Sequence, residues 1–81
     1  MAATREDIRG WLNYAKSKNA THMIVVCDTF EWEDYPVEVY PDQIVADVVK
    51  KYSDNMQKVM EVYNMSLDLE SQLSETRAYH L

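Results

Sequence analysis

The sequence contains few of the residues that cross-link a chain or interrupt it. Its 81 residues include one cysteine, Cys27, which excludes an intramolecular disulfide and a cysteine-based zinc site. One glycine and two prolines leave little of the chain for flexible linkers. Because the hydrophobic fraction is 47%, these features predict a single globular α+β domain covering residues 1–81.

Long apolar runs and basic residues are also scarce. The longest uninterrupted apolar run, Met23–Cys27, is far too short to cross a bilayer, and the first ten residues lack the apolar stretch of a signal peptide. We therefore expect a cytoplasmic protein that does not bind membranes. No Lys or Arg occurs between Asn19 and Val49, and the net charge is −6. This acidic centre would repel phosphates, so we expect no direct binding to nucleic acid.

Local patterns in the first half predict a helix and two strands. Thr4 and Asp7 have the spacing of a capping box, and Asn19 is suited to end the helix in a left-handed conformation. The helix should bury one face, formed by Ile8, Trp11, Leu12 and Ala15. The run His22–Cys27 is apolar on both faces, which predicts a central strand. Residues 28–34 are expected to form a loop, and Tyr35–Tyr40 a second strand that Pro36 confines to an edge.

The second half predicts a helix, an ambiguous segment and a last helix. Pro41 and Asp42 are expected to start the first of these, with Lys50 and Lys51 at its end. Its apolar face would comprise Ile44, Val45, Val48, Val49 and Tyr52. Ser66 is the expected N-cap of the last helix, whose face would comprise Leu69, Leu73 and Thr76.

Residues 56–65 fit two kinds of secondary structure. Met56, Val59, Met60 and Tyr63 have helical spacing, while residues 58–63 also alternate as a strand does. We favour a strand, because a turn-like sequence at residues 53–55 precedes the segment. The element order is then α-β-β-α-β-α. Since the most apolar strand belongs in the middle, we predict a three-stranded antiparallel sheet of order 2-1-3, covered by helices on at least one face.

Aromatic and acidic residues alternate after the first strand. The aromatic residues are Phe30, Trp32, Tyr35 and Tyr40, and the acidic residues are Glu31, Glu33, Asp34 and Glu38. Aromatic anchors surrounded by charge of one sign are typical of protein-recognition surfaces. We predict a protein-binding site here for a basic or mixed partner surface, with Trp32 and Tyr35 as anchors. The alternative is that Phe30 and Trp32 fold back over the core.

The same carboxylates support a rival hypothesis, a divalent-metal protein or hydrolase that uses residues 28–34. An EF-hand loop starting at Asp28 is excluded, because Phe30 occupies its third position and Glu33 the position of the required glycine. A Cys27–His22 pair is also excluded, because five residues along a strand place the side chains on opposite faces. Serine-nucleophile, phosphate-loop and zinc-protease motifs are absent, so we expect no enzyme activity and no cofactor.

Self-association is a further possibility. Five methionines are many for this length, and Met56, Met60 and Met65 fall within the ambiguous segment. If helices leave Val59, Met60, Val62 or Tyr63 uncovered, a second copy of the chain would bury them. The sequence therefore also allows a homodimer, either as an addition to the binding role or as a purely structural homo-oligomer.

Three stretches resemble a known family: TREDIRGWLNYAK, ATHMIVVCDTFEWEDYPVEVY and NMQKVMEVYNMSLDLESQL. They are similar to small uncharacterised proteins of bacterial and phage genomes, and together they cover most of the chain. The resemblance implies a small cytoplasmic accessory protein. It transfers no catalytic residue, because that family has no assigned activity.

Overall fold

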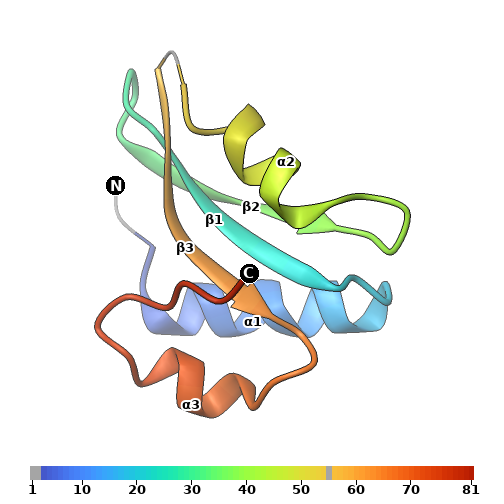
Figure 1. Ribbon diagram of the computed structural model, residues 1–81. Helices are drawn as coiled ribbons and strands as arrows, with labels where there is room; N and C mark the ends of the chain where they lie inside the picture. The colour runs from blue at the N-terminus through green and yellow to red at the C-terminus, as the bar shows by residue number, and fades with distance from the viewer. Residues whose placement is uncertain (1–2, 55) are drawn as a thin grey trace.

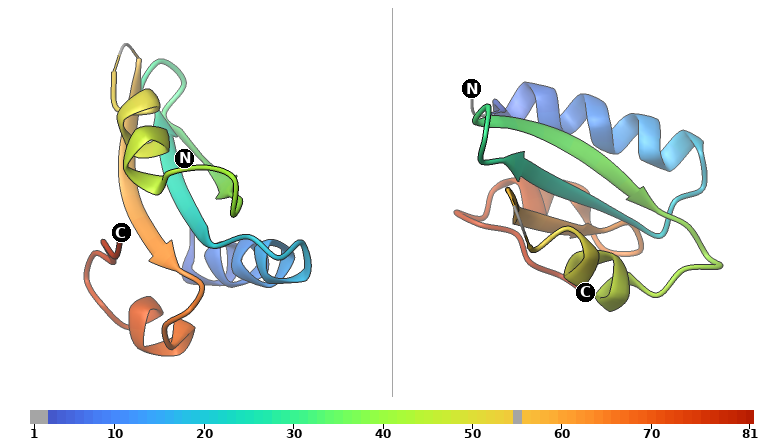
Figure 2. Two further views of the ribbon diagram at one scale, coloured as in Figure 1. Left: turned by 45° about the vertical axis from the view of Figure 1, so that its right-hand side comes forward. Right: turned by 90° about the horizontal axis from the view of Figure 1, so that it is seen from above.

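A computed structural model describes residues 3–54 and 56–81 and confirms the predicted α+β fold. The elements of this part of the chain are α1 (Arg5–Ser17), β1 (His22–Asp28), β2 (Glu33–Val39), α2 (Val45–Lys51), β3 (Gln57–Asn64) and α3 (Leu69–Leu73). The strands form one antiparallel sheet in the order β2-β1-β3. The helices α1 and α3 lie on one side of the sheet and α2 lies on the other (Figures 1 and 2).

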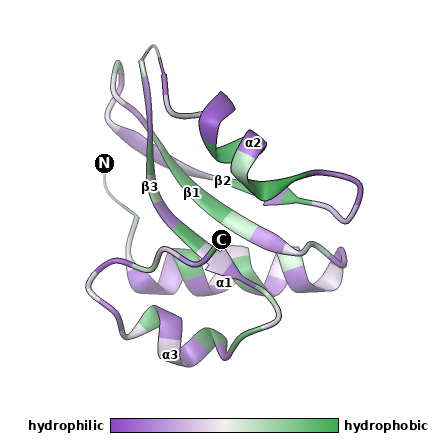
Figure 3. Cartoon of the chain, in the orientation of Figure 1, coloured by the Kyte–Doolittle hydropathy of each residue, from purple (hydrophilic) through white to green (hydrophobic). Residues whose placement is uncertain are grey.

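The central strand β1 supplies the core on both sides of the sheet. All residues from Met23 to Cys27 are buried, and β1 is green along most of its length in Figure 3. Met23 and Val25 pack with α1 and α3, whereas Ile24 and Val26 pack with α2. The prediction of a central strand that is covered on both faces is therefore confirmed.

The helix α1 forms as its sequence predicts. The Asp7 amide donates to Thr4 Oγ1 and the Thr4 amide donates to the Asp7 carboxylate, each at 3.1 Å, so the capping box is complete. Ile8, Leu12 and Ala15 are buried against the sheet. The helix ends before Asn19, which has the left-handed φ of 62° expected of it.

Arg5 links the start of α1 to β3 and to the chain beyond α3. Its guanidinium donates to the Glu61 carboxylate at 3.1 Å and to the Tyr63 hydroxyl at 3.0 Å. It also donates to the backbone oxygen of Glu75 at 3.0 Å. Burial raises the pKa of Tyr63 strongly, and the hydrogen bond that its hydroxyl donates to Glu61 adds to this rise. The Tyr63 phenol therefore stays neutral and holds Glu61 toward Arg5.

Gln72 is a buried polar residue that fastens α3 to the end of β3. Its side chain is 2% exposed. The Gln72 amide oxygen accepts from the Asn64 backbone N–H at 2.8 Å, and Gln72 Nε2 donates to the Asn64 carbonyl oxygen at 2.9 Å. Gln72 thus pairs with Asn64 as a neighbouring strand would, and the last residue of β3 is fixed by this pair.

A β-bulge in β3 explains why residues 56–65 resembled a helix. Val25 is paired with Glu61 but Val26 is paired with Val59, so Met60 is an extra residue on β3. The bulge places Met60 and Glu61 in succession toward α1, so Val59 and Val62 are three residues apart on the α2 side and Met60 and Tyr63 are three residues apart on the α1 side. The strand interpretation is confirmed, and the ambiguity reflects the bulge.

The predicted start of α2 was wrong. Residues 40–43 form a turn, in which the Gln43 amide donates to the Tyr40 carbonyl oxygen and Gln43 Oε1 accepts from the Tyr40 amide. The helix therefore begins at Val45 instead of at Pro41 and Asp42. Ile44 becomes the N-cap, makes no side-chain capping bond and is exposed, so it does not belong to the apolar face.

The predicted start and end of α3 were also wrong. The Ser66 amide and hydroxyl both donate to Asn64 Oδ1 in a turn that precedes the helix. Asp68 is the N-cap instead and accepts from the Glu70 amide at 3.0 Å. Because α3 has five residues and ends at Leu73, Thr76 lies beyond it and is exposed.

The structure removes the argument for dimerisation through β3. Val59, Val62 and Tyr63 are buried and Met60 is half-buried, so this strand leaves no large apolar face to cover. Residues near the C-terminus cover part of the edge of β3, since the Val62 amide donates to the Ala78 carbonyl oxygen at 2.9 Å.

None of the helices described has the length and apolar character needed to cross a membrane.

Candidate protein-binding site at the hairpin tip

A short, hydrogen-bonded turn joins β1 to β2 at one end of the sheet. The cross-strand pair Asp28–Glu33 closes it, so the loop comprises residues 29–32 and is shorter than the predicted loop of residues 28–34. Asp28 Oδ1 accepts from the Phe30 amide at 2.9 Å, and the Asp28 carbonyl oxygen accepts from the Trp32 amide at 2.6 Å. The loop is held by Asp28 before any partner binds. We call residues 29–33 the hairpin tip.

The hairpin tip exposes two large aromatic side chains. Phe30 is 70% exposed and Trp32 is 63% exposed. The alternative in which both fold back over the core is therefore wrong.

Trp32 has a backbone conformation that costs free energy. Its φ is 57°, in the left-handed region, where a residue with a Cβ atom is about 1–2 kcal/mol less stable than in the right-handed region. Glycine or asparagine would close the same turn with less strain. A tryptophan at this position therefore makes the turn less stable than glycine or asparagine would, and it also exposes a large aromatic ring.

Exposed carboxylates lie next to the two aromatic residues in the chain and in the adjoining loop. Glu31 lies between them in the chain, and Glu31 and Glu33 are both exposed. Asp54, in the loop that precedes β3, is also exposed, and this loop lies beside the tip because the Thr29 amide donates to the Met56 carbonyl oxygen at 2.8 Å. The tip contains no Lys or Arg. Its field therefore favours a positively charged partner surface.

Tyr35 packs against the core and does not join the exposed aromatic residues of the tip. Tyr35 packs in the apolar cluster under α2, and its hydroxyl accepts from Gln57 Nε2 at 2.6 Å. Burial raises the pKa of Tyr35. This residue is half-buried and structural, so Phe30 replaces it beside Trp32 as the second exposed aromatic residue.

The remaining predicted site residues do not join the tip. Asp34 and Glu38 lie on the α1 side of the sheet, and the Asp34 carboxylate accepts from the Ala3 amide at 2.9 Å. Tyr40 follows the far end of β2 and packs against the α1 cluster. The predicted segment is thus divided between a tip of Phe30, Glu31, Trp32 and Glu33 and residues that support the sheet.

Met56 belongs to the same surface and was not predicted as a site residue. Its side chain is exposed, and its backbone contacts Thr29 at the base of the tip. It comes from a different loop, so spacing within residues 28–40 could not reveal it. The pairing of Asp28 with Gln57 across β1 and β3 brings the two loops together.

The carboxylates of residues 28–34 do not converge on a metal site. The Asp28 carboxylate binds amides of its own loop, and the Asp34 carboxylate binds the Ala3 amide on the other side of the sheet. Among residues 3–54 and 56–81, no three His, Cys, Asp or Glu side chains come together to hold a metal ion. The geometry of these residues gives the metal hypothesis no support.

Cys27 and His22 lie near opposite ends of β1. Cys27 is buried, and burial, together with the nearby Asp34 carboxylate, raises the pKa of its thiol. A buried thiol with a raised pKa is a poor nucleophile.

Comparison of the chain with protein-family models, curated proteins and solved structures gave no match. The resemblance to small bacterial and phage proteins therefore stays a prediction.

Proposed function

We propose that this protein is a non-enzymatic binding module whose hairpin tip docks into a concave, basic site on a partner protein. The observation that carries the proposal is the exposure of Phe30 and Trp32 on one hydrogen-bonded turn, with Glu31 and Glu33 next to them in the chain. Large aromatic side chains contribute most when they enter a partner's pocket. The carboxylates would speed the encounter with a positively charged rim.

The hydrogen bonds within the hairpin tip add to the expected affinity. The Asp28 side chain and backbone already hold the turn, so little conformational entropy is lost when the partner binds. We place the module in the cytoplasm, where a lone buried thiol such as Cys27 stays reduced. Its partner is a protein with a basic or mixed surface, because the acidic tip would repel nucleic acid.

The test is quantitative affinity capture with the wild-type chain and two tip variants, Phe30→Ala and Trp32→Gly. Glycine removes the Trp32 ring and also suits the left-handed turn, so this variant should fold at least as stably as the wild type. Tyr14→Ala is the matched control, because Tyr14 is an aromatic residue of α1 that is 54% exposed. Circular dichroism and thermal melting must show that all four proteins fold.

We expect one captured partner to be retained by Tyr14→Ala and lost by both tip variants. With purified components, each tip variant should weaken binding by about thirtyfold, the scale of an interface hot spot. Charge reversal at Glu31 and Glu33 should slow association and reduce its salt dependence. Equal capture by the tip variants and the control would exclude the hairpin tip as the interface.

A further inference from the structure

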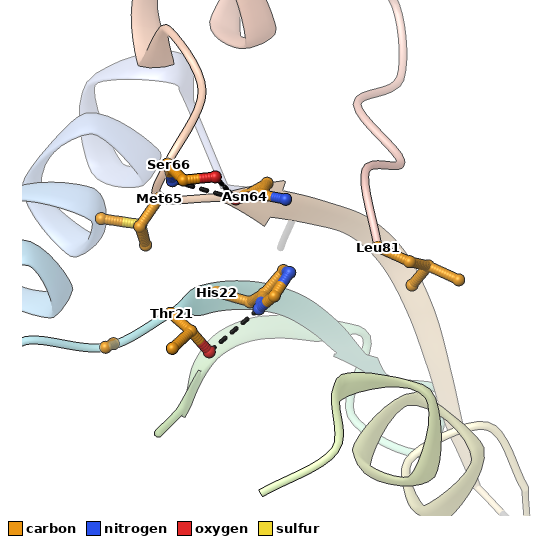
Figure 4. Close-up of a pocket in the computed structure, with 7 residues that line it drawn as sticks. Thr21, His22, Asn64, Met65, Ser66 and Leu81 are labelled. Carbon is orange, nitrogen blue, oxygen red and sulfur yellow. Dashed lines mark hydrogen bonds between the residues drawn. The ribbon is translucent and has the colours of Figure 1, made fainter. Parts of the chain in front are cut away.

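The two edges of the sheet differ in how their backbone groups are used. β3 forms one edge and β2 forms the other (Figure 2). Along β3, the chain beyond α3 turns back beside the strand. The Val62 amide donates to the Ala78 carbonyl oxygen at 2.9 Å, and the Val62 carbonyl oxygen accepts from the His80 amide at 3.0 Å. The chain ends at Leu81, which lines a hollow at the end of the sheet together with Asn64 (Figure 4).

Two side chains bond further backbone groups of the β3 edge. Arg77 donates to the Met60 carbonyl oxygen at 2.7 Å and to the Val59 carbonyl oxygen at 3.3 Å. Gln72 bonds both backbone groups of Asn64, as described above. Between Val59 and Asn64, the β3 edge is therefore largely occupied and offers little to a further strand.

The β2 edge, in contrast, presents a row of free backbone groups. The Val39 carbonyl oxygen accepts from the Thr21 amide at 2.7 Å, so it faces β1. Backbone direction alternates along an antiparallel strand, so the groups of Asp34, Pro36 and Glu38 face away from β1. Pro36 fits this arrangement, because it has no N–H to give to β1. In the part of the chain that the structure describes, no hydrogen bond reaches the backbone of these three residues.

The side chains of β2 determine which strand can pair with this edge. Asp34 and Glu38 lie on the α1 side of the sheet, one at each end of the free row. Tyr35 and Val37 lie on the α2 side and pack in its apolar cluster. Residues directly opposite each other in an antiparallel pair share a face. A matching strand therefore has basic residues opposite Asp34 and Glu38 and apolar residues opposite Tyr35 and Val37.

A second copy of this chain is a poor partner for the same edge. Symmetric pairing about Pro36 would place Asp34 of each copy opposite Glu38 of the other, and like charges directly opposite each other are destabilising. The two prolines would also meet without an N–H to donate. Charged residues and proline protect natural edge strands from self-association in this way. The same carboxylates favour a basic strand.

We propose that the free edge of β2 binds an extended, basic segment of another protein, which pairs antiparallel to β2 as a fourth strand of the sheet. The Asp34 and Glu38 amides donate to this segment, and the carbonyl oxygens of Asp34, Pro36 and Glu38 accept from it. The surface is separate from the hairpin tip, and its occupation does not require the partner of the tip.

The probe is the peptide acetyl-Ser-Arg-Val-Thr-Val-Arg-Ser-amide, which places Arg opposite Asp34 and Glu38 and Val opposite Tyr35 and Val37. It is titrated into the ¹⁵N-labelled full chain, and NMR measures the exchange of each amide with water. With about nine-tenths of the protein bound, exchange at Asp34 and Glu38 should slow about tenfold. The Tyr35 and Val37 amides, which face β1, should change little. A peptide with Glu in place of Arg should bind about tenfold more weakly.

Two N-methylated peptides separate strand pairing from attraction between charges. Methylation of the central Thr nitrogen removes the N–H that the Pro36 carbonyl oxygen accepts, and it should weaken binding about tenfold. Methylation of a Val nitrogen, which faces away from β2, should leave binding nearly unchanged. The second peptide is the matched control, because its charge and length are the same.

Three variants of the protein locate the binding. Glu38→Gln should weaken binding of the peptide about threefold. Glu6→Gln, on the exposed surface of α1, is the matched control and should bind as the wild type does. Trp32→Gly should also bind the peptide as the wild type does, so failure at the hairpin tip and failure at the β2 edge are separate results.

The proposal is overturned by any of four results. These are equal binding of the two methylated peptides, signal shifts confined to residues 29–33, no binding at millimolar peptide, and protection of the Asp34 and Glu38 amides that rises with protein concentration in the absence of peptide. The last result would show that a second copy of the chain occupies the edge.

Discussion

The helices α1 and α2 cover opposite faces of one sheet, but they are built differently. The helix α1 has 13 residues, a complete capping box and a row of buried residues. The helix α2 has seven residues, an exposed Ile44 at an N-cap without a side-chain bond, and one buried residue, Val48. The α1 face also carries the Arg5 and Gln72 hydrogen bonds. The comparison indicates that the α1 face holds most of the stability and that α2 is the weaker cover.

The largest expected effect comes from truncating the core on each face. Leu12→Ala, on the α1 side, should lower the free energy of unfolding by about 3 kcal/mol, because it opens a cavity in a fully buried site. Val48→Ala, in α2, should cost about 1–2 kcal/mol, since fewer atoms are removed and alanine is the better helix former. Urea unfolding followed by circular dichroism measures both. Equal losses would show that the two faces contribute alike.

A smaller effect is expected from removing one buried or half-buried glutamine on each face. Gln72→Ala leaves the amide and carbonyl groups of Asn64 without their partner, which should cost about 1–3 kcal/mol. Gln57→Ala is the counterpart on the α2 face, where the Gln57 side chain makes a single bond to the Tyr35 hydroxyl. It should cost about 1 kcal/mol or less. The comparison fails if Gln57→Ala proves the more damaging change in urea unfolding.

The smallest effects concern the helix caps, and they should have opposite signs. Thr4→Ala removes the capping bond of α1 and should destabilise the protein by about 1 kcal/mol. Ile44→Ser supplies α2 with the capping hydroxyl that it lacks and should stabilise the protein by up to about 1 kcal/mol. Shifts in melting temperature report both signs. If Ile44→Ser instead lowers the melting temperature, the apolar contacts of Ile44 stabilise the protein more than a capping hydroxyl would.

The sequence was sufficient for α1 and for the order of the strands. Local signals are strong there: the Thr4 and Asp7 spacing, the helical repeat of apolar residues and the apolar run that became β1. The starts of α2 and α3 were predicted wrongly, because the side chains of Gln43 and Asn64 bond nearby backbone groups and stabilise turns where helices were expected. Such bonds depend on geometry that spacing does not contain.

The candidate sites show the same limit. The alternation of aromatic and acidic residues included the hairpin tip, but the pattern could not separate the exposed Phe30 from the half-buried Tyr35. Met56 joins the tip through pairing of β1 with β3. Pro36 correctly predicted that β2 is an edge strand, but the closure of the β3 edge by Arg77 depends on the path of the chain beyond α3. Contacts between distant strands follow from register, and the bulge at Met60 shifts that register.

The central place of β1 has a consequence for the order in which the protein assembles during synthesis. Its partner β2 follows after a short turn, but its other partner, β3, leaves the ribosome only after α2 has been made. Until then one edge of β1 and the apolar run Met23–Cys27 lack their cover on that side. An unpaired apolar strand edge is a template for association between chains. We therefore expect released chains that end within α2 to aggregate and released chains that include β3 to remain monomeric.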